Sequence, residues 1–340
     1  MASNRSRKPS PDHLLAPEQF PELNRAFYAT RPWEYFRHRE RLLALTAGAP
    51  EKLLAAGRDG VQVGRLHFQL QGDPQQEEQD AEDRERFLLA DSEILLHHVS
   101  ETLLRLYLAH ENLPPCPWLE VARVRGPGAF KKLVQGRFVE GPPQDESRRR
   151  VAGVFLGTSN PKGLTPHPPI EAWNEGLDNI EAFLRHYARH FLDADVYNAL
   201  KHGLVVRPGD SHTQLDDGEL IKAEGPALEY LSQRKDVSGR LRWNRSTRWL
   251  EFDRSLVFVF MATRLMESLW SIARARYLED EPPPINLWTE PAYGQVADRL
   301  EEGQNSAILV DTMHMELAYY LDPDHGGDAA ELAQATRGSP

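Results

Sequence analysis

The residues best suited to chemistry lie in one short stretch, from Asp193 to Gly203. Asp193 and Asp195 are good helix N-caps, since a short carboxylate accepts the free backbone N–H groups of a first turn. Gly203 is a good terminator, because the residue after a helix often needs a positive φ. Asn198 and His202 are four residues apart, so a helix places both on one face. An amide and an imidazole so placed predict either a structural hydrogen-bond network or a small reactive site.

The segment from Tyr197 to Gly203, Tyr-Asn-Ala-Leu-Lys-His-Gly, resembles the Arg-Asn-x-x-x-His-Gly element of the HEPN superfamily. The resemblance implies a helical-bundle domain, and many domains of that superfamily are metal-independent RNases of toxin–antitoxin and antiviral systems. It implies catalytic roles for Asn198 and His202, with the histidine moving a proton at the 2′-OH or at the leaving oxygen. Tyr197 stands in place of the arginine that stabilises the pentavalent phosphate, and a tyrosine supplies no positive charge.

An arginine on another helix is a candidate to supply that charge. Arg105, Arg185 and Arg189 lie on long predicted helices of the same bundle. The catalytic set that we expect from the resemblance is His202, Asn198, Arg185 and Arg105. It needs no metal ion and no cofactor. If Tyr197 abolishes catalysis, the expectation becomes a catalytically lapsed relative that binds RNA or a protein partner.

A second function follows from a stripe of polar residues on the helix predicted over 86–110. Glu93, His97, Glu101 and Arg105 follow one another at intervals of four, so they share one helix face. Carboxylates and imidazoles on facing helices make the metal sites of helical bundles. Glu93, His97 and Glu101 therefore predict a metal-binding protein as an alternative, with further ligands from His186, His190 or His202. The other interpretation is a series of ion pairs and hydrogen bonds along a half-exposed face.

Other catalytic templates are incomplete or missing. His186 and His190 have the spacing of zinc-hydrolase histidines, but residue 187 is Tyr where that motif has its Glu. We expect a solvated or capping pair instead. The sequence contains no dinucleotide fingerprint, no Walker phosphate loop and no nucleophile elbow. The single cysteine, Cys116, lies between prolines and is expected to be a buried structural thiol.

Basic and aromatic residues gather between positions 234 and 249, where a surface hairpin is predicted. Such interleaving can bind phosphates and stack bases. The other interpretation is a hairpin whose tryptophans pack inward. The residues concerned are Arg234, Lys235, Arg240, Arg242, Trp243, Arg245, Arg248 and Trp249.

The composition limits which classes of partner and which cellular location we expect. The net charge of −11 argues against a protein that coats DNA non-specifically. The polar N-terminus lacks the apolar core of a signal peptide, and no apolar run approaches the roughly 20 residues that span a bilayer. We therefore expect a cytoplasmic protein with no membrane partner. RNA or a protein partner remains, and the non-enzymatic alternative is an interaction scaffold that forms a homodimer.

Periodicity predicts the elements that position these residues. Three long helices are expected over 86–110, 169–192 and 253–278, with a short one over 195–202. Shorter helices are expected at 118–124, 128–134 and 148–156, a strand at 61–70, and a loop over 71–84. The β insertion is expected to turn at Pro208–Asp210 and at Asn244–Thr247. The fold class is thus mainly α, a bundle of long helices with a small β insertion. The predicted segments are a disordered tail (1–16), a helical and β segment (17–80), the HEPN-like bundle core (81–203), the β insertion (204–252), a closing helix (253–280), a C-terminal extension (281–322) and a flexible tail (323–340).

Overall fold

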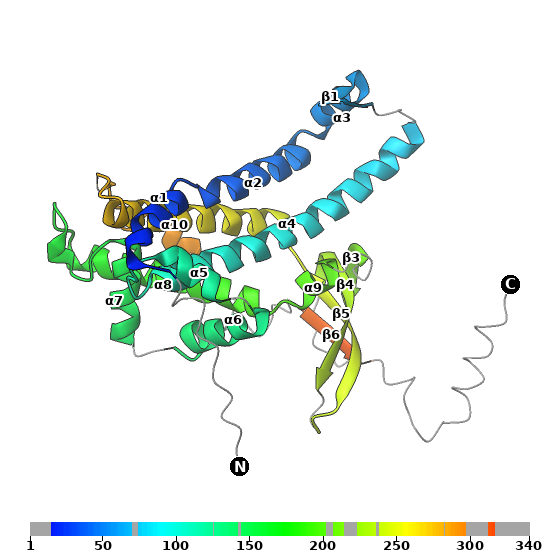
Figure 1. The fold of residues 1–340 in the computed structure, drawn as a ribbon. Helices are drawn as coiled ribbons and strands as arrows, with labels where there is room; N and C mark the ends of the chain where they lie inside the picture. Colours follow the sequence, from blue (N-terminus) through cyan, green and yellow to red (C-terminus); the bar gives the residue numbers. More distant parts are fainter. Residues whose placement is uncertain are drawn as a thin grey trace, which may run out of the picture. The chain divides into compact units, whose positions relative to one another are not determined.

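The computed structural model of the chain, shown in Figure 1, describes residues 15–69, 74–124, 126–141, 144–201, 207–213, 223–235, 238–281, 283–296 and 312–316. The chain divides into two compact units. Unit 1 comprises Met1–Leu42, Leu95–Asp193 and Leu256–Asn305, and unit 2 comprises Leu43–Ile94, Ala194–Ser255 and Ser306–Pro340.

Helices account for most of the described structure, and several begin with proline, whose fixed φ and missing N–H suit a first helical turn. The helical elements are η2 Pro17–Gln19, α1 Phe20–Tyr28, α2 Pro32–Gly48, α3 Pro50–Asp59, α4 Pro74–His110, α5 Pro117–Arg123, α6 Pro127–Val134, the π-helical turn η3 Gln135–Val139, α7 Gln144–Phe155, η4 Pro161–Gly163, α8 Ile170–Leu192, α9 Asp195–Lys201 and α10 Phe252–Tyr277. The strands are β1 Val61–Val63, β2 Leu66–Phe68, β3 Arg207–Thr213, β4 Ala223–Lys235, β5 Leu241–Trp249 and β6 Thr312–Glu316. The predicted fold class, mainly α with a small β part, is confirmed.

The helix predictions are confirmed for α5 to α10, and α4 is longer than expected. Residues 74–84 are helical, so the loop predicted over 71–84 is wrong wherever the structure describes it. Glutamate and glutamine are good helix formers, and here they extend the helix. Phe87 of α4, Ile170 of α8 and Phe260 of α10 are exposed.

The core of unit 1 is rich in aromatic rings. Tyr28 is fully buried, and its ring centroid lies 5.1 Å from that of Trp270 and 5.7 Å from that of Tyr277. Its hydroxyl lies 2.8 Å from Nε2 of His110, whose Nδ1 lies 2.6 Å from the carbonyl oxygen of Leu106. The carbonyl can only accept, so Nδ1–H donates to it and Nε2 accepts from Tyr28. Both ring nitrogens of a neutral His110 are therefore satisfied.

Helix α8 approaches the segment 283–289 through a glycine. A Cβ built on Gly176 would lie 1.7 Å from the carbonyl oxygen of Leu287, closer than any real contact. One turn later, the Asn179 side chain donates a 2.8 Å hydrogen bond to the carbonyl oxygen of Trp288. Trp288 is buried and has a φ of +60°. Glycine is the only residue that permits this approach of two backbones.

Unit 2 contains a four-stranded antiparallel sheet with the strand order β3-β4-β5-β6 (Figure 1). Its fourth strand comes from 312–316, so the sheet is completed by the C-terminal extension as well as by the insertion. Helix α9 packs on this sheet through a small apolar cluster. Val196 and Ala199 of the helix and Leu228 and Tyr230 of β4 form its buried part.

Several strand and turn predictions are wrong. Asn244–Thr247 does not turn but lies inside β5, where it pairs with β4 and with β6. The buried hydroxyl of Ser246 is satisfied because it forms a 2.8 Å hydrogen bond with the hydroxyl of Ser232 on β4. Pro208–Asp210 lies within β3. The strand predicted at 61–70 is instead a hairpin of β1 and β2.

Two further predictions concern the membrane and the termini. Helix α10 is long and apolar enough to cross a bilayer, although 61% of its most apolar window is buried in the protein. A buried core helix passes the same test, so this finding is compatible with a soluble protein. The strand candidates at 204–206 and 220–222, most of the N-terminal tail and the C-terminal tail lie outside the described residues. The linear segment boundaries remain predictions.

Candidate functional site

The predicted site centres on α9, which presents one apolar and one polar face. Val196 and Ala199 are buried against β4, whereas Asn198 is exposed. Asp195 is the first residue of the helix and Asp193 is the C-cap of α8, so Asp193 belongs to the preceding helix. Residues three and four apart are neighbours on a helix, so Asp195 and Asn198 share the exposed face.

His202 and Gly203 lie outside the described residues. The position of the imidazole therefore remains a prediction from spacing. The spacing of four residues predicts that His202 shares a helix face with Asn198. Among the described residues, Asp195 and Asn198 form a polar line along α9.

An arginine of the sheet reaches the start of this line. Nη2 of Arg234 on β4 lies 3.4 Å from Oδ2 of Asp195, and the two side chains are 43% and 45% exposed. Arg242 is the partner of Arg234 across β4 and β5, so two guanidinium groups project from the same sheet face. Sequence reasoning placed Arg234 in the basic hairpin and missed its pairing with Asp195, because the two residues are 39 positions apart.

The other two predicted catalytic residues belong to unit 1, whereas Asn198 belongs to unit 2. Arg105 has an occupied guanidinium: Nε donates to Glu101 at 2.8 Å, Nη1 donates to the carbonyl of Val124 at 2.8 Å, and the group lies 4.0 Å from the Phe130 ring centre. Arg185 is 3.7 Å from Oε2 of Glu181 on its own helix. Both arginines thus have partners within unit 1.

The opposite face of the sheet carries other members of the basic and aromatic set. Side chains alternate along a strand, so Trp243 and Arg245 lie on one face and the buried Asn244 and Ser246 on the other. Trp243 is 45% exposed, so the interpretation in which the tryptophans pack inward is wrong for this residue. The Arg245 guanidinium contacts both carboxylate oxygens of Glu229, at 2.8 and 2.7 Å.

Two histidines of α8 contact aromatic rings. His186 stacks on Phe258 with 4.2 Å between ring centres, and the ring centre of His190 lies 6.0 Å from that of His97. His190 is only 8% exposed, so the prediction of a solvated pair is wrong for this residue. Among the residues that the structure describes, no group of three or more His, Cys, Asp or Glu side chains could hold a metal ion. Glu101, the third ligand of the metal alternative, binds Arg105 instead. Cys116 is buried, as predicted.

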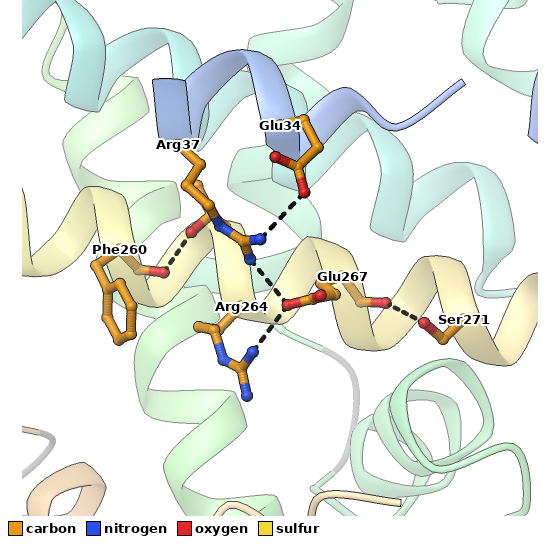
Figure 2. Close-up of polar contacts among 7 residues, drawn as sticks. Glu34, Arg37, Phe260, Arg264, Glu267 and Ser271 are labelled. Atoms are coloured by element: carbon orange, nitrogen blue, oxygen red, sulfur yellow. Dashed lines mark hydrogen bonds and ion pairs between the residues drawn. The ribbon is translucent and has the colours of Figure 1, made fainter. Parts of the chain in front are cut away.

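A charged network that the sequence did not indicate joins α2 to α10 (Figure 2). The Glu267 carboxylate accepts from Arg37 and from Arg264, at 2.9 Å each, and Arg37 also contacts Glu34 at 3.1 Å. The network borders a cavity of 620 Å³ that also includes Glu40 and Glu290. Burial raises the pKa of the Glu40 carboxyl. With Arg41, which also lines the cavity, three guanidinium groups meet four carboxylates here, so the arrangement joins two helices and does not form an anion site.

Comparisons with models of protein families, with curated proteins and with solved structures found no match to this chain.

Proposed function

We propose that the chain is a HEPN-like protein of the cytoplasm that cleaves RNA without a metal ion. In this proposal His202 transfers a proton, Asn198 orients the phosphate, and Arg234 supplies the positive charge that Tyr197 lacks. The observation that supports it most is the contact between Arg234 and Asp195 at 3.4 Å. It brings a guanidinium to the polar line that contains Asn198.

The proposed reaction needs only proton transfers and charge stabilisation. The 2′-oxygen of the RNA bonds to the adjacent phosphorus and gives up its proton, while the bond from phosphorus to the 5′-oxygen of the next nucleotide breaks. That 5′-oxygen gains a proton, so the products are a 2′,3′-cyclic phosphate and a free 5′-hydroxyl. His202 handles one of the two protons, which is work suited to an imidazole near neutral pH. Arg234 offsets the extra negative charge on the phosphorus oxygens.

Arg234 is suited to this role because its present partner holds it weakly. Both members of the pair are more than two-fifths exposed, and exposed ion pairs stabilise a fold by at most about 1 kcal/mol. A phosphate can therefore take the guanidinium from Asp195 at little cost. Trp243 is exposed on the sheet face opposite to Arg234, the face that also carries Arg245. A base of the same RNA can stack on this tryptophan.

The test is cleavage of a single-stranded RNA in EDTA. We expect wild-type protein to cleave it, and His202→Ala and Arg234→Ala each to lose about 100-fold in rate, the typical contribution of one acid–base or charge-stabilising group. His167→Ala and Arg149→Ala, which change exposed residues of unit 1, serve as matched controls and should cleave at the wild-type rate. Equal cleavage by wild type and His202→Ala would refute the proposal. RNA binding without cleavage would indicate that the protein is a catalytically lapsed relative that binds RNA.

A second function, a homodimeric scaffold without activity, is favoured by a different surface. Val61, Val63, Leu66 and Phe68 of the β1–β2 hairpin are 44–62% exposed. Exposed apolar patches mark protein contacts, and an isolated two-stranded hairpin is marginally stable in water. Light scattering after size exclusion should give twice the chain mass, and Phe68→Glu should give the monomer. A wild-type monomer would exclude this function.

A further inference from the structure

Unit 1 contains a cavity of 230 Å³ that the proposed RNase reaction does not use. Four elements line it: α4, the π-helical turn η3, α7 and α8. It is smaller than the roughly 300–1,000 Å³ of sites for drug-sized ligands, so its occupant is a compact molecule. The π-helical turn itself is notable, since such turns occur frequently at functional sites.

The wall of the cavity combines apolar surface with a buried carboxylate. Tyr107, Phe138, Val151 and Leu184 supply ring and aliphatic surface, and the rings of Tyr107 and Phe138 lie 5.5 Å apart. Glu181 also lines the cavity, although its side chain is only 7% exposed. A buried carboxylate amid such surface is costly unless each oxygen has a donor.

One oxygen of Glu181 has no donor. Oε2 lies 3.7 Å from Arg185, whereas Oε1 is buried with no hydrogen-bond partner in the described structure. Buried polar atoms without partners are rare in native proteins and often mark a binding or catalytic role. The terminal torsion of a glutamate is soft, so Oε1 can turn toward a ligand in the cavity.

The charges around the cavity decide the chemistry of the ligand. Arg185 stands beside Glu181, and Arg137 donates to Glu111 through Nε at 2.7 Å. A cationic ligand would therefore meet two guanidinium groups, whereas a neutral N–H donor would not be repelled. The side chain of Arg185 is 40% exposed, so it can also meet an anionic group at the mouth of the cavity.

We propose that this cavity binds the base of a guanine nucleotide, with Glu181 accepting its N–H donors and Arg185 contacting its phosphate. Guanine presents N1–H and the N2 amino group side by side, a donor pair that matches one carboxylate. Adenine offers a donor and an acceptor on the same edge, so it matches the carboxylate less well. Phe138 provides an aromatic surface beside the base. This site lies wholly in unit 1 and does not depend on the proposed cleavage by residues of unit 2.

The experiment is calorimetric titration of the full chain with GMP, IMP and AMP in EDTA. We expect GMP to bind at least tenfold more tightly than AMP, with IMP, which lacks the N2 amino group, between them. Glu181→Gln should weaken GMP binding at least tenfold, because its amide keeps only one acceptor oxygen. Glu175→Gln, an exposed residue of the same helix, is the matched control and should bind GMP as the wild type does.

Two results would overturn the site. One is equal binding, or no binding, of GMP and AMP to the wild-type protein, a result that requires no variant to fold. The other is unchanged GMP binding by a folded Glu181→Gln, with folding checked by circular dichroism and thermal unfolding. Since neither measurement involves cleavage, failure here leaves the RNase proposal intact, and loss of the RNase proposal leaves this site intact.

Discussion

Helices α8 and α9 follow each other directly in the chain, but their units hold them in different ways. Along α8, 13 residues are buried, Gly176 meets backbone, and the Tyr187 hydroxyl donates to the carbonyl of Phe258 at 2.8 Å. Along α9, Val196 and Ala199 are the buried residues, and Asp195 makes an exposed ion pair with Arg234. A helix buried along most of its length in a core is held rigidly, whereas one with an exposed polar face leaves that face accessible.

The largest effect should come from adding one methyl group to α8. Gly176→Ala places a Cβ against the carbonyl oxygen of Leu287, so either α8 or the 283–289 segment must move. We expect a loss of about 3 kcal/mol or more in the free energy of unfolding, measured by urea denaturation. Gly153→Ala on α7 is the matched control, because nothing lies within 4 Å of its added Cβ. There the gain in helix propensity should keep or raise stability. Similar values for the two variants would contradict the described approach of backbones.

Acid should weaken unit 1 through His110. Burial lowers the pKa of this imidazole from 6.5 to about 4, and the hydrogen bond that it donates to the Leu106 carbonyl only partly opposes the shift. Between these pH values the unfolded chain binds a proton that the folded chain does not, so stability falls as the pH drops from about 6.5 to 4. The contribution of this one group is about 3 kcal/mol.

The measurement is the difference in unfolding free energy between wild type and His110→Gln across pH 4 to 7. Taking the difference removes the contributions of the buried carboxyls of Glu40, Glu111 and Glu181, which are present in both proteins. Burial raises their pKa values, so their effect on stability has the opposite sign to that of His110. We expect the wild type to lose more stability on acidification than the variant. Parallel curves would show that His110 is not buried as a neutral ring.

A smaller loss is expected when the apolar cluster beneath α9 is reduced. Leu228→Ala removes a fully buried side chain from β4, and we expect a cost of about 2 kcal/mol, at the low end for such truncations because the cluster is small. Amide hydrogen exchange should speed up in α9 and remain unchanged in α8. Leu231→Ala, on the same strand but 50% exposed, is the control. Equal acceleration in both helices would remove the distinction drawn between them.

The smallest effect on stability should come from Arg234→Ala. Its pair with Asp195 is exposed, so we expect a change of at most about 0.5 kcal/mol in the free energy of unfolding. The same variant should lose about 100-fold in RNA cleavage. A large loss of stability would instead make Arg234 a structural brace for α9, and would weaken its assignment as the phosphate-binding group.

The sequence alone determined most of the long helices and the short α9. Helical hydrogen bonds and apolar faces link residues three and four apart, so α8, α9 and α10 could be predicted from their periodicity, whereas the start of α4 at Pro74 was predicted as a loop. The prediction from sequence was wrong at Asn244–Thr247. This run of polar residues indicated a turn, but it is part of β5, which pairs with a strand on each side.

Only the tertiary structure decided which distant residues meet. The alternation of residues along a strand predicts which side chains share a face of the sheet, but not which strand lies beside it. The local pattern therefore did not predict that 312–316 pairs at the sheet edge, that Arg234 contacts Asp195 or that Leu287 approaches Gly176. The donor-free oxygen of Glu181 is of the same kind, since a missing partner is visible only once all neighbours are placed. Hydrogen bonds and contacts between residues close in the chain repeat at the period of a helix or strand, so the sequence shows that period. Contacts between residues far apart in the chain produce no such period.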